Sequence, residues 1–486
     1  MTKTWLRKAL LPVAMPMLAA CTVVGPDYRL PDHALVRAPE SSMALAKPDY
    51  SMVSPAPVPN DWWRLYDDPQ VDALVQRALI ANTSLRLAAA NLRRAVAIYH
   101  EIESENLVQG GIAAKTERAQ LAGESVLLTE KIPVFNLGDY GISVSYLVDL
   151  FGKLARSDEA ALANAEASQA ALDAARVAVV AQTVRAYVEG CAAGQELQVT
   201  ERQLILQRQV SALARRMVAA GKSQPSEASQ AQSEAERLES ALPVFKARMA
   251  AAAYRLSAML GEPPGETAEA RAECNALPAL SRPMPVGDGA ALLRRRPDLR
   301  QAERDLASAT ARIGVATADL YPSVRIGASA GVTGLLSDLG TGPTVHWGFG
   351  PLLTWSFPSN GVRPRIHAME ANADAMLARF DGTVLKALEE TRTALNAYAN
   401  ELERNKSLRK AKVAAAAVAS EHRQLYQGGR LPYLASLDAD RTLNRTEQEL
   451  AASDSQVALR QVTLFEALGG GWKGAPAPIE RHAAQE

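Results

Sequence analysis

Residues 215–222 read RRMVAAGK and residues 422–430 read HRQLYQGGR, each at the end of a long alanine-rich tract. A second pair of landmarks follows them, LSAMLG at 256–261 and LFEALG at 464–469. Gly221 and Gly429 are 208 positions apart, and so are Gly261 and Gly469. Because one offset fits both landmarks, the sequence indicates a duplicated half-molecule with pseudo-twofold internal symmetry rather than a short-period solenoid.

The tracts around these landmarks have the pattern of two very long helical hairpins. The outgoing helices are predicted over about 155–220 and 362–427, and each would be about 99 Å long if unbroken. The returning helices are predicted over about 226–260 and 432–468. The outgoing helices carry an apolar stripe with coiled-coil spacing, namely Ala170, Ala174, Val177, Ala181, Val184 and Val188 in the first and Val384, Leu388, Thr391, Leu395, Tyr398 and Leu402 in the second. The alternative is an amphipathic helix on an ordinary globular core.

Each outgoing helix is preceded by segments that alternate with period two, which predicts two β-hairpins at about 107–149 and 322–357. The strands are long enough to cross a bilayer obliquely, with an apolar row facing lipid and a Gly/Ser row facing water. Four strands cannot close a barrel, and open sheet edges are not tolerated in hydrocarbon, so more than one chain is required. A soluble sheet with one face on a core is the alternative.

The composition excludes several functional classes. The chain has 53 basic and 53 acidic residues, so nucleic acid is not an expected partner. Hydrophobic residues make up 48% but aromatic residues only 5%, as in closely packed helices. The six histidines are scattered, and no Ser/His/Asp, Cys/His or metal-binding grouping has interpretable spacing. We therefore expect neither an enzyme nor a cofactor.

The N-terminus has the pattern of a secretory signal peptide over residues 1–20, with three basic residues before the apolar run 9–20. The run ends in LAAC at 18–21, which resembles a bacterial lipobox, so Cys21 would become the lipidated first residue of the mature chain. Thr22 after the cysteine, rather than an Asp, favours the outer membrane, where acyl chains would hold the N-terminus on a leaflet. An ordinary cleavage site with a chance cysteine is the alternative.

The remaining boundaries follow from composition. Residues 21–60 form a proline-rich linker that is expected to run extended. The first repeat covers 61–261, with a further helical pattern at about 71–104, and the second repeat covers 291–472. Residues 262–290 link the repeats, and 473–486 form a tail.

Two local features remain to be assigned. Cys191 is expected to pack on its helix as a small hydrophobe, with a disulfide to Cys274 as the alternative in an exported chain. The run Arg294–Asp298 is expected to open a helix near Pro297 and is given no binding role.

Together these features resemble the outer-membrane channels of tripartite efflux pumps, the TolC-like family, in its NodT or OprM lipoprotein branch. The motifs that carry the resemblance are VGPDY at 24–28, SY at 145–146 with DLFGK at 149–153, LLRRRPD at 292–298 with AE at 302–303, YPS at 321–323 and ALGGGW at 467–472. The resemblance implies a mainly α fold with a small β part. Three chains would share one transmembrane β-barrel, and their duplicated α-hairpins would form a long α-helical barrel through the periplasm.

The resemblance also implies partners and site residues. A periplasmic adaptor and an inner-membrane pump would deliver small molecules, and outer-membrane lipid would surround the strands. Asp438 matches a family carboxylate that helps ring the periplasmic aperture, where three copies would create a negative field that favours cations. A solvated coiled-coil carboxylate is the alternative for Asp438.

The glycine turns at the hairpin tips are candidate docking sites for the adaptor. They contain Gly221 and Lys222 in the first repeat and Gly428, Gly429 and Arg430 in the second. A purely structural turn is the alternative, since every helical hairpin must reverse.

The predicted function is therefore passive export through a duct in the outer membrane. A type I protein-secretion outlet with the same duct is one alternative. A lipid-anchored periplasmic scaffold of coiled coils is another, although a scaffold has no need of a lipid-facing row on its strands.

Overall fold

The computed structural model describes residues 23–43, 53–120, 122, 124, 127, 129–265, 274, 276–280 and 282–474. Its contacts divide the chain into two compact units. The described parts of Met1–Pro31, Leu92–Ser168 and Ala302–Phe380 form unit 1, and those of Asp32–Asn91, Gln169–Gln301 and Asp381–Glu486 form unit 2. The signal peptide, Cys21 and most of the C-terminal tail lie outside the described residues.

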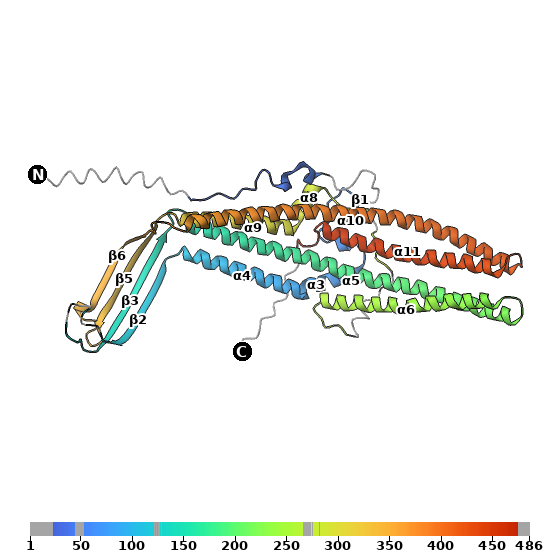
Figure 1. The fold of residues 1–486 in the computed structure, drawn as a ribbon, viewed down its shortest axis with the longest axis horizontal. Coiled ribbons are helices and arrows are strands. Elements are labelled where there is room, and N and C mark those ends of the chain that lie inside the picture. The colour runs from blue at the N-terminus through green and yellow to red at the C-terminus, as the bar shows by residue number, and fades with distance from the viewer. Residues whose placement is uncertain are drawn as a thin grey trace. The chain divides into compact units, whose positions relative to one another are not determined.

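Unit 1 contains an antiparallel sheet with the strand order β2-β3-β5-β6 (Figure 1). The strands are β2 (Gln109–Ala119), β3 (Phe135–Val148), β5 (Ser323–Leu335) and β6 (Val345–Thr354). The two predicted hairpins are therefore confirmed, and the register of the first pairs Ile112 with Ile142.

The second hairpin ends earlier than predicted. Its first strand, β5, runs to Leu335, and within it Gly331 approaches β3 so closely that a Cβ there would lie 2.5 Å from the Tyr140 carbonyl oxygen. β6 ends at Thr354, which pairs with Ser323, the first residue of β5. Trp355 and Phe357 therefore have no ladder partner and lie outside β6, although the predicted hairpin extends to 357.

Each strand of the sheet is preceded or followed along the chain by a helix whose described part belongs to unit 1. These are the last part of α4 (Thr83–Glu105), the start of α5 (Lys153–Ala219), most of α9 (Pro297–Ala318) and the start of α10 (Val362–Gln427). Asp149 caps α5 by accepting a hydrogen bond from the Ala155 N–H at 2.9 Å. Phe151 stacks on Tyr321 with ring centroids 4.5 Å apart, which joins the β3–α5 connection to the α9–β5 connection.

Unit 2 contains two helical hairpins that repeat each other closely. Their returning helices, α6 (Pro225–Met259) and α11 (Tyr433–Ala467), both have 35 residues. The glycine landmarks also match, with φ of +69° at Gly221 and Gly261 and +68° at Gly429 and Gly469. Left-handed glycines end helices in this way because they lack a Cβ. The structure thus confirms the duplication that the 208-residue offset predicts.

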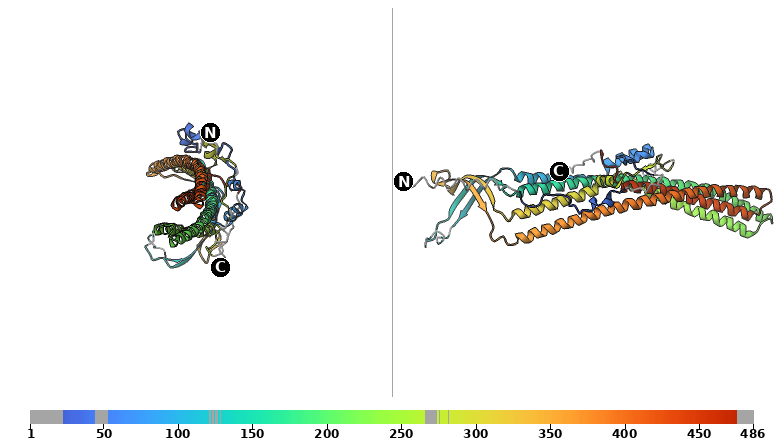
Figure 2. Two further views of the ribbon diagram at one scale, coloured as in Figure 1. Left: turned by 90° about the vertical axis from the view of Figure 1, so that its right-hand side faces the viewer. Right: turned by 90° about the horizontal axis from the view of Figure 1, so that it is seen from above.

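The two hairpins lie side by side (Figures 1 and 2). Near the tips, Ala214 of α5, Ala231 of α6 and Leu437 of α11 form one buried cluster. Tyr433 donates its hydroxyl hydrogen to the Val210 carbonyl oxygen at 3.2 Å. The residues of both predicted coiled-coil stripes are buried or half-buried, as helix-to-helix seams require.

One predicted helix proves to be two. α3 (Pro69–Ala81) and α4 meet at Asn82, which is 2% exposed. The Asn82 Oδ1 atom accepts hydrogen bonds from the N–H groups of Ser84 and Leu85, and so it caps α4. The continuous helix expected over 71–104 is therefore wrong at this residue.

The linkers are more ordered than a proline-rich composition suggested. Short 3-10 turns, η1 (Leu35–Arg37) and η2 (Pro39–Ser42), interrupt the first linker, and another, η3 (Trp62–Tyr66), lies at the start of the first repeat. Within the linker between the repeats, β4 (Met284–Pro285) pairs in parallel with β1 (Val53–Ser54), and α8 (Gly289–Arg295) begins just before the predicted boundary.

The cysteines also correct a prediction. Cys191 and Cys274 form a disulfide, with Cα atoms 5.5 Å apart. Cys191 is 3% exposed, as expected of a packed helix residue, but it is bonded rather than free. The disulfide attaches the linker between the repeats to α5.

Candidate functional site

One face of the sheet in unit 1 is an exposed apolar surface, which we call the apolar face. Side chains that are directly opposite each other across the strands fall on the same face. The register aligns apolar rows across the sheet, namely Ile112–Ile142–Ala330–Trp347, Val144–Ala328–Phe349, Tyr146–Ile326–Pro351 and Val148–Val324–Leu353. Trp347, Phe349 and Ile112 are 80%, 77% and 86% exposed. Apolar surface of this extent on a sheet indicates contact with lipid or another apolar partner.

The opposite face, which we call the polar face, carries small and charged side chains. Its rows include Gly111–Ser143–Ser329–Gly348 and Ser145–Gly327–Gly350. Thr333 donates its hydroxyl hydrogen to Asp139 at 2.8 Å, and the Arg325 guanidinium donates to the Ser145 hydroxyl at 3.2 Å. The sheet thus has one apolar face and one polar face, as the alternation predicted.

The sheet has two edge strands, β2 and β6. Neither edge can remain unpaired in a hydrocarbon environment, because each unpaired backbone N–H or C=O group costs several kcal/mol there. With four strands per chain, closure needs neighbouring copies.

The predicted tip residues all lie at exposed positions of unit 2. Gly221, Lys222, Gly428, Gly429 and Arg430 are exposed, and a Cβ added to Gly221 or Gly429 would meet nothing within 4 Å. Backbone hydrogen bonds close the turns, for example from the Lys222 N–H to the Met217 carbonyl oxygen at 2.9 Å. The two tips are therefore open surfaces with one basic side chain each.

Asp438 lies on α11 one turn beyond the second tip. Its neighbours Leu437 and Ala439 are buried, whereas Asp438 is exposed and makes no ion pair with any residue that the structure describes. The position therefore presents an unneutralised carboxylate to solvent. The nearby Asp440 differs, because burial raises its pKa and Arg423 lies 3.5 Å from it.

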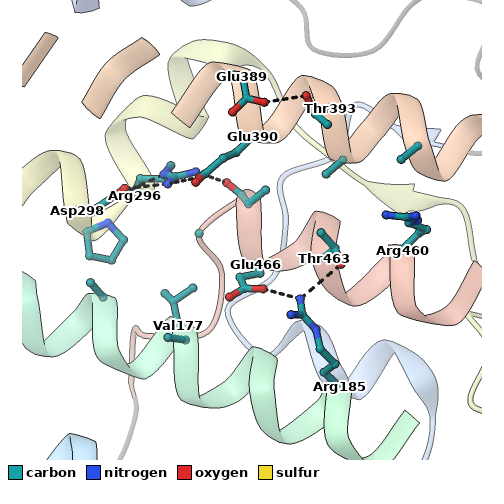
Figure 3. A pocket seen from close by; sticks show the side chains of 17 residues that line it. Val177, Arg185, Arg296, Asp298, Glu389, Glu390, Thr393, Arg460, Thr463 and Glu466 are labelled. Atoms are coloured by element: carbon teal, nitrogen blue, oxygen red, sulfur yellow. Dashed lines mark hydrogen bonds and ion pairs between the residues drawn. The ribbon is translucent and has the colours of Figure 1, made fainter. Parts of the chain in front are cut away.

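A cavity of about 560 Å³ lies between α5, α10 and α11 of unit 2 (Figure 3). Arg296 is its central residue, and its guanidinium donates to Asp298, to Glu390 at 2.8 Å and to the Ala467 carbonyl oxygen at 2.9 Å. Across the cavity, Arg185 pairs with Glu466 at 2.7 Å. Both arginines are already paired with carboxylates. Their contacts around the cavity hold the hairpin bases together, and we call this cluster of contacts the joint.

Sequence reasoning missed this joint. It assigned the run Arg294–Asp298 only to a helix start, and α9 does begin at Pro297. The partners of Arg296 are 94 and 171 positions away, so no local pattern indicated them. The adjacent Arg295 is also partly buried, which lowers its pKa to about 10.

No helix among the described residues combines the length and hydropathy needed to cross a membrane. No group of three or more His, Cys, Asp or Glu side chains in the same part of the chain could hold a metal ion.

A two-faced sheet joined to duplicated helical hairpins defines an outer-membrane channel of the TolC-like class. The family model described as outer membrane efflux protein matches residues 74–262 and 290–470. The chain belongs to this family. It is the outer-membrane channel component of a tripartite efflux system, as the sequence predicted.

Individual relatives agree with this assignment. Nodulation protein T of Rhizobium leguminosarum bv. trifolii is 27% identical over 458 residues, which cover 94% of this chain and 96% of the relative. Outer membrane protein OprJ of Pseudomonas aeruginosa is 30% identical over 423 residues, which cover 85% and 86%. The solved outer-membrane channel OprN superposes with a TM-score of 0.83 at 32% identity, covering 92% of this chain and 99% of that structure.

Proposed function

We propose that three copies of this chain form a passive duct that exports small molecules across the outer membrane. The observation that carries the proposal is the four-stranded sheet, which has an apolar and a polar face and two edges. Members of the family are trimeric channels that work with an adaptor and an inner-membrane pump. Three such sheets would contribute twelve strands, more than the roughly eight of the smallest closed membrane barrels.

We assign Asp438 to a selectivity ring at the periplasmic end of the helices. Its exposure and its lack of an ion-pair partner among the described residues support this role. Three symmetric carboxylates would concentrate cations and repel anions, because close like charges add to a focused field. The position one turn earlier is Ala435, so the ring rests on Asp438 alone at this level.

We assign the tips to docking of the periplasmic adaptor. Their exposed glycines allow another helical end to approach the backbone closely. Lys222 and Arg430 add one positive charge to each tip and would favour an acidic partner surface.

We further propose that Cys21 is acylated and anchors the mature chain to outer-membrane lipid. The lipobox-like stretch 18–21 supports this assignment. Two acyl signals, or one together with an inserted β-barrel, give stable attachment where a single chain alone would be marginal.

Conductance of the purified, full-length protein in planar lipid bilayers tests the duct. We expect discrete ion-conducting steps with a preference for cations. Asp438→Ala should lower the cation-to-anion permeability ratio severalfold, while Asp374→Ala, which removes the same charge from an exposed position of α10 in unit 1, should leave it unchanged. An absence of conductance in the unaltered protein would contradict the duct and favour a scaffold. Equal ratios in all three proteins would contradict the selectivity ring alone.

A further inference from the structure

The first described residues form a segment with unusually specific contacts, which we call the strap (Val23–Tyr28). It contains the VGPDY motif at 24–28, to which the channel function assigns no role. Every described contact considered below lies within unit 1.

The strap crosses α9 at a point where two glycines meet. Gly25 has a φ of +86°, and a Cβ added to it would lie 2.4 Å from the Gly314 Cα atom. A Cβ on Gly314 would lie 2.9 Å from the Val24 carbonyl oxygen and 2.7 Å from the Arg156 Cγ atom. Neither residue tolerates a side chain without displacing the strap, so this crossing depends on both glycines.

A buried arginine holds the crossing in place. The Arg156 side chain is 5% exposed, and its guanidinium donates to the Val24 carbonyl oxygen at 3.2 Å and to the Gly25 carbonyl oxygen at 3.3 Å. It also pairs with Asp27 at 2.7 Å and Glu159 at 2.6 Å. Burial disfavours the charge, yet these two carboxylates outweigh the burial and raise the pKa of Arg156. Such a forked donor set is available from Arg but not from Lys.

The two ends of the strap are attached as well. At its start, the Val24 N–H donates to the Phe151 carbonyl oxygen at 3.1 Å, and Val23 packs against Gly152. At its end, the Tyr28 hydroxyl donates to Glu303 at 3.3 Å. Burial of the Tyr28 ring raises its pKa above the usual range, so the hydroxyl stays a donor.

These contacts unite three of the motifs that carried the family resemblance. The strap supplies the first, the β3–α5 connection at 149–153 supplies the second, and Glu303 of α9 belongs to the third. Terminal segments are usually poorly ordered unless specific contacts attach them. A surface linker alone would need neither a glycine crossing nor a buried guanidinium.

The strap begins two residues after Cys21. Two residues of extended chain reach at most about 7 Å. The attachment point itself is the Phe151 carbonyl group, in the connection between the membrane-facing strand β3 and helix α5. Phe151 stacks on Tyr321, and Trp355 donates its indole N–H to the Leu320 carbonyl oxygen at 3.2 Å, so three aromatic residues lie at this strand–helix junction.

We propose that the strap fixes the place at which the acyl chains of Cys21 enter the membrane, next to the strand–helix junction of the same chain. The inference rests on the proposed acylation of Cys21. The partner is the lipid leaflet that faces the periplasm, and the strap makes this a fixed lipid attachment beside the barrel strands. Arg156 and Asp27 are positioning residues, because they act on the lipid through the strap.

Photo-crosslinking from the acyl chains tests the position directly. Cells that express the full chain are fed a diazirine-bearing fatty acid and irradiated, and the labelled peptides are identified by mass spectrometry. In the unaltered protein we expect the label on peptides that contain Phe151, Tyr321 or Trp355. In Arg156→Ala the tether lengthens severalfold, so the label on these peptides should fall about tenfold, because local concentration falls steeply with tether length. Label transferred to bulk lipid should persist.

Two further variants keep the test decisive if Arg156→Ala does not fold. Asp27→Asn removes the exposed partner of the pair without creating a cavity and should lower the junction label in the same direction. Arg185→Ala is the matched control, because it breaks an arginine pair in unit 2 that does not touch the strap, and its label should match the unaltered protein.

The outcomes separate the two proposals. An unchanged junction label in both Arg156→Ala and Asp27→Asn would overturn the strap, while conductance would still support the duct. Absence of any acyl label on the chain would overturn the anchor and the strap together, again without bearing on conductance.

Discussion

Four glycines have the same backbone conformation in different surroundings. Gly221, Gly261, Gly429 and Gly469 share a φ of +68° to +69°. At the tips, Gly221 and Gly429 have open space where a Cβ would be, whereas a Cβ on Gly261 would lie 2.6 Å from the Ala81 carbonyl oxygen. At Gly469 the same atom would lie 2.9 Å from Arg296. Within the chain itself, the tip glycines are thus required only by the turn, and the basal glycines also by packing.

Alanine substitution separates these two requirements. Gly221→Ala and Gly429→Ala should each destabilise the fold by about 1–2 kcal/mol, the cost of a left-handed residue with a Cβ. Gly261→Ala and Gly469→Ala should cost about 1–3 kcal/mol more, because the added atom also meets close-packed neighbours. Midpoints of thermal unfolding in detergent, measured at one scan rate, check the order. If the unfolding midpoint shifts equally at all four positions, the neighbours at the hairpin bases move away from the added Cβ atom at no cost in stability.

At the scale of the element, the strands show how alternating apolar and polar residues produce a sheet with one apolar and one polar face. Val144 points to the apolar face and its neighbour Ser143 to the polar face, in rows that continue across β5 and β6. The disulfide shows a second kind of constraint, since it connects α5 to a linker segment 83 residues further along the chain.

A pair of lysine substitutions tests the assignment of the two faces. Val144→Lys places a charge in the apolar row and should cost about 2–4 kcal/mol per chain near the bilayer midplane. We expect it to abolish SDS-resistant trimers in the outer-membrane fraction. Ser143→Lys, one residue away in the same strand, should be tolerated because it faces water. If both variants assemble equally well, the apolar face does not contact lipid.

Reduction tests the disulfide. Breaking the Cys191–Cys274 bond should lower the stability by about 2–4 kcal/mol, because it releases a long loop in the unfolded chain. Thermal unfolding with and without a reductant measures the change. The double variant Cys191→Ser with Cys274→Ser is the control and should be insensitive to the reductant. A midpoint that the reductant does not move in the unaltered protein would contradict a stabilising bond.

At the scale of the whole molecule, the number of strands determines how copies can join. The order β2-β3-β5-β6 alternates in direction, so β6 of one copy is antiparallel to β2 of the next when the sheet continues across copies. An even number of strands per chain is what allows closure by repetition of a single interface.

Engineered cysteines test this closure. Ala113→Cys on β2 is combined in turn with Gly348→Cys, Gly350→Cys and Leu352→Cys on β6, all on the polar face. Opposed residues of antiparallel strands lie about 4.5–5.5 Å apart, within the reach of a disulfide. At least one pair should yield a covalent trimer on non-reducing gels, and Ala113→Cys alone should not. If no pair links chains, the barrel edges do not meet as proposed.

Local patterns predicted most of the elements, but not the contacts that unite them. The strand alternation, the hairpin glycines and the helix start at Pro297 all depend on residues that are close in the chain. The sequence therefore predicts each of them. Asn82 before Thr83 was also a local capping signal, and it was overlooked. By contrast, Arg156 and Asp27 are 129 positions apart, and Arg296 and Ala467 are 171 apart. The periodicity of a sequence does not indicate contacts between residues so far apart in the chain. Only the three-dimensional structure therefore reveals the strap and the joint.

The equal lengths of α6 and α11 have a consequence for whatever meets the hairpin tips. A trimer would offer six such tips of two alternating kinds, which differ in Lys222 against Arg430 and in Ala220 against Gly428. A cap made of six identical subunits would have to accept both kinds in alternation. A cap made of three could instead contact one tip of each kind with every subunit, through two different surfaces.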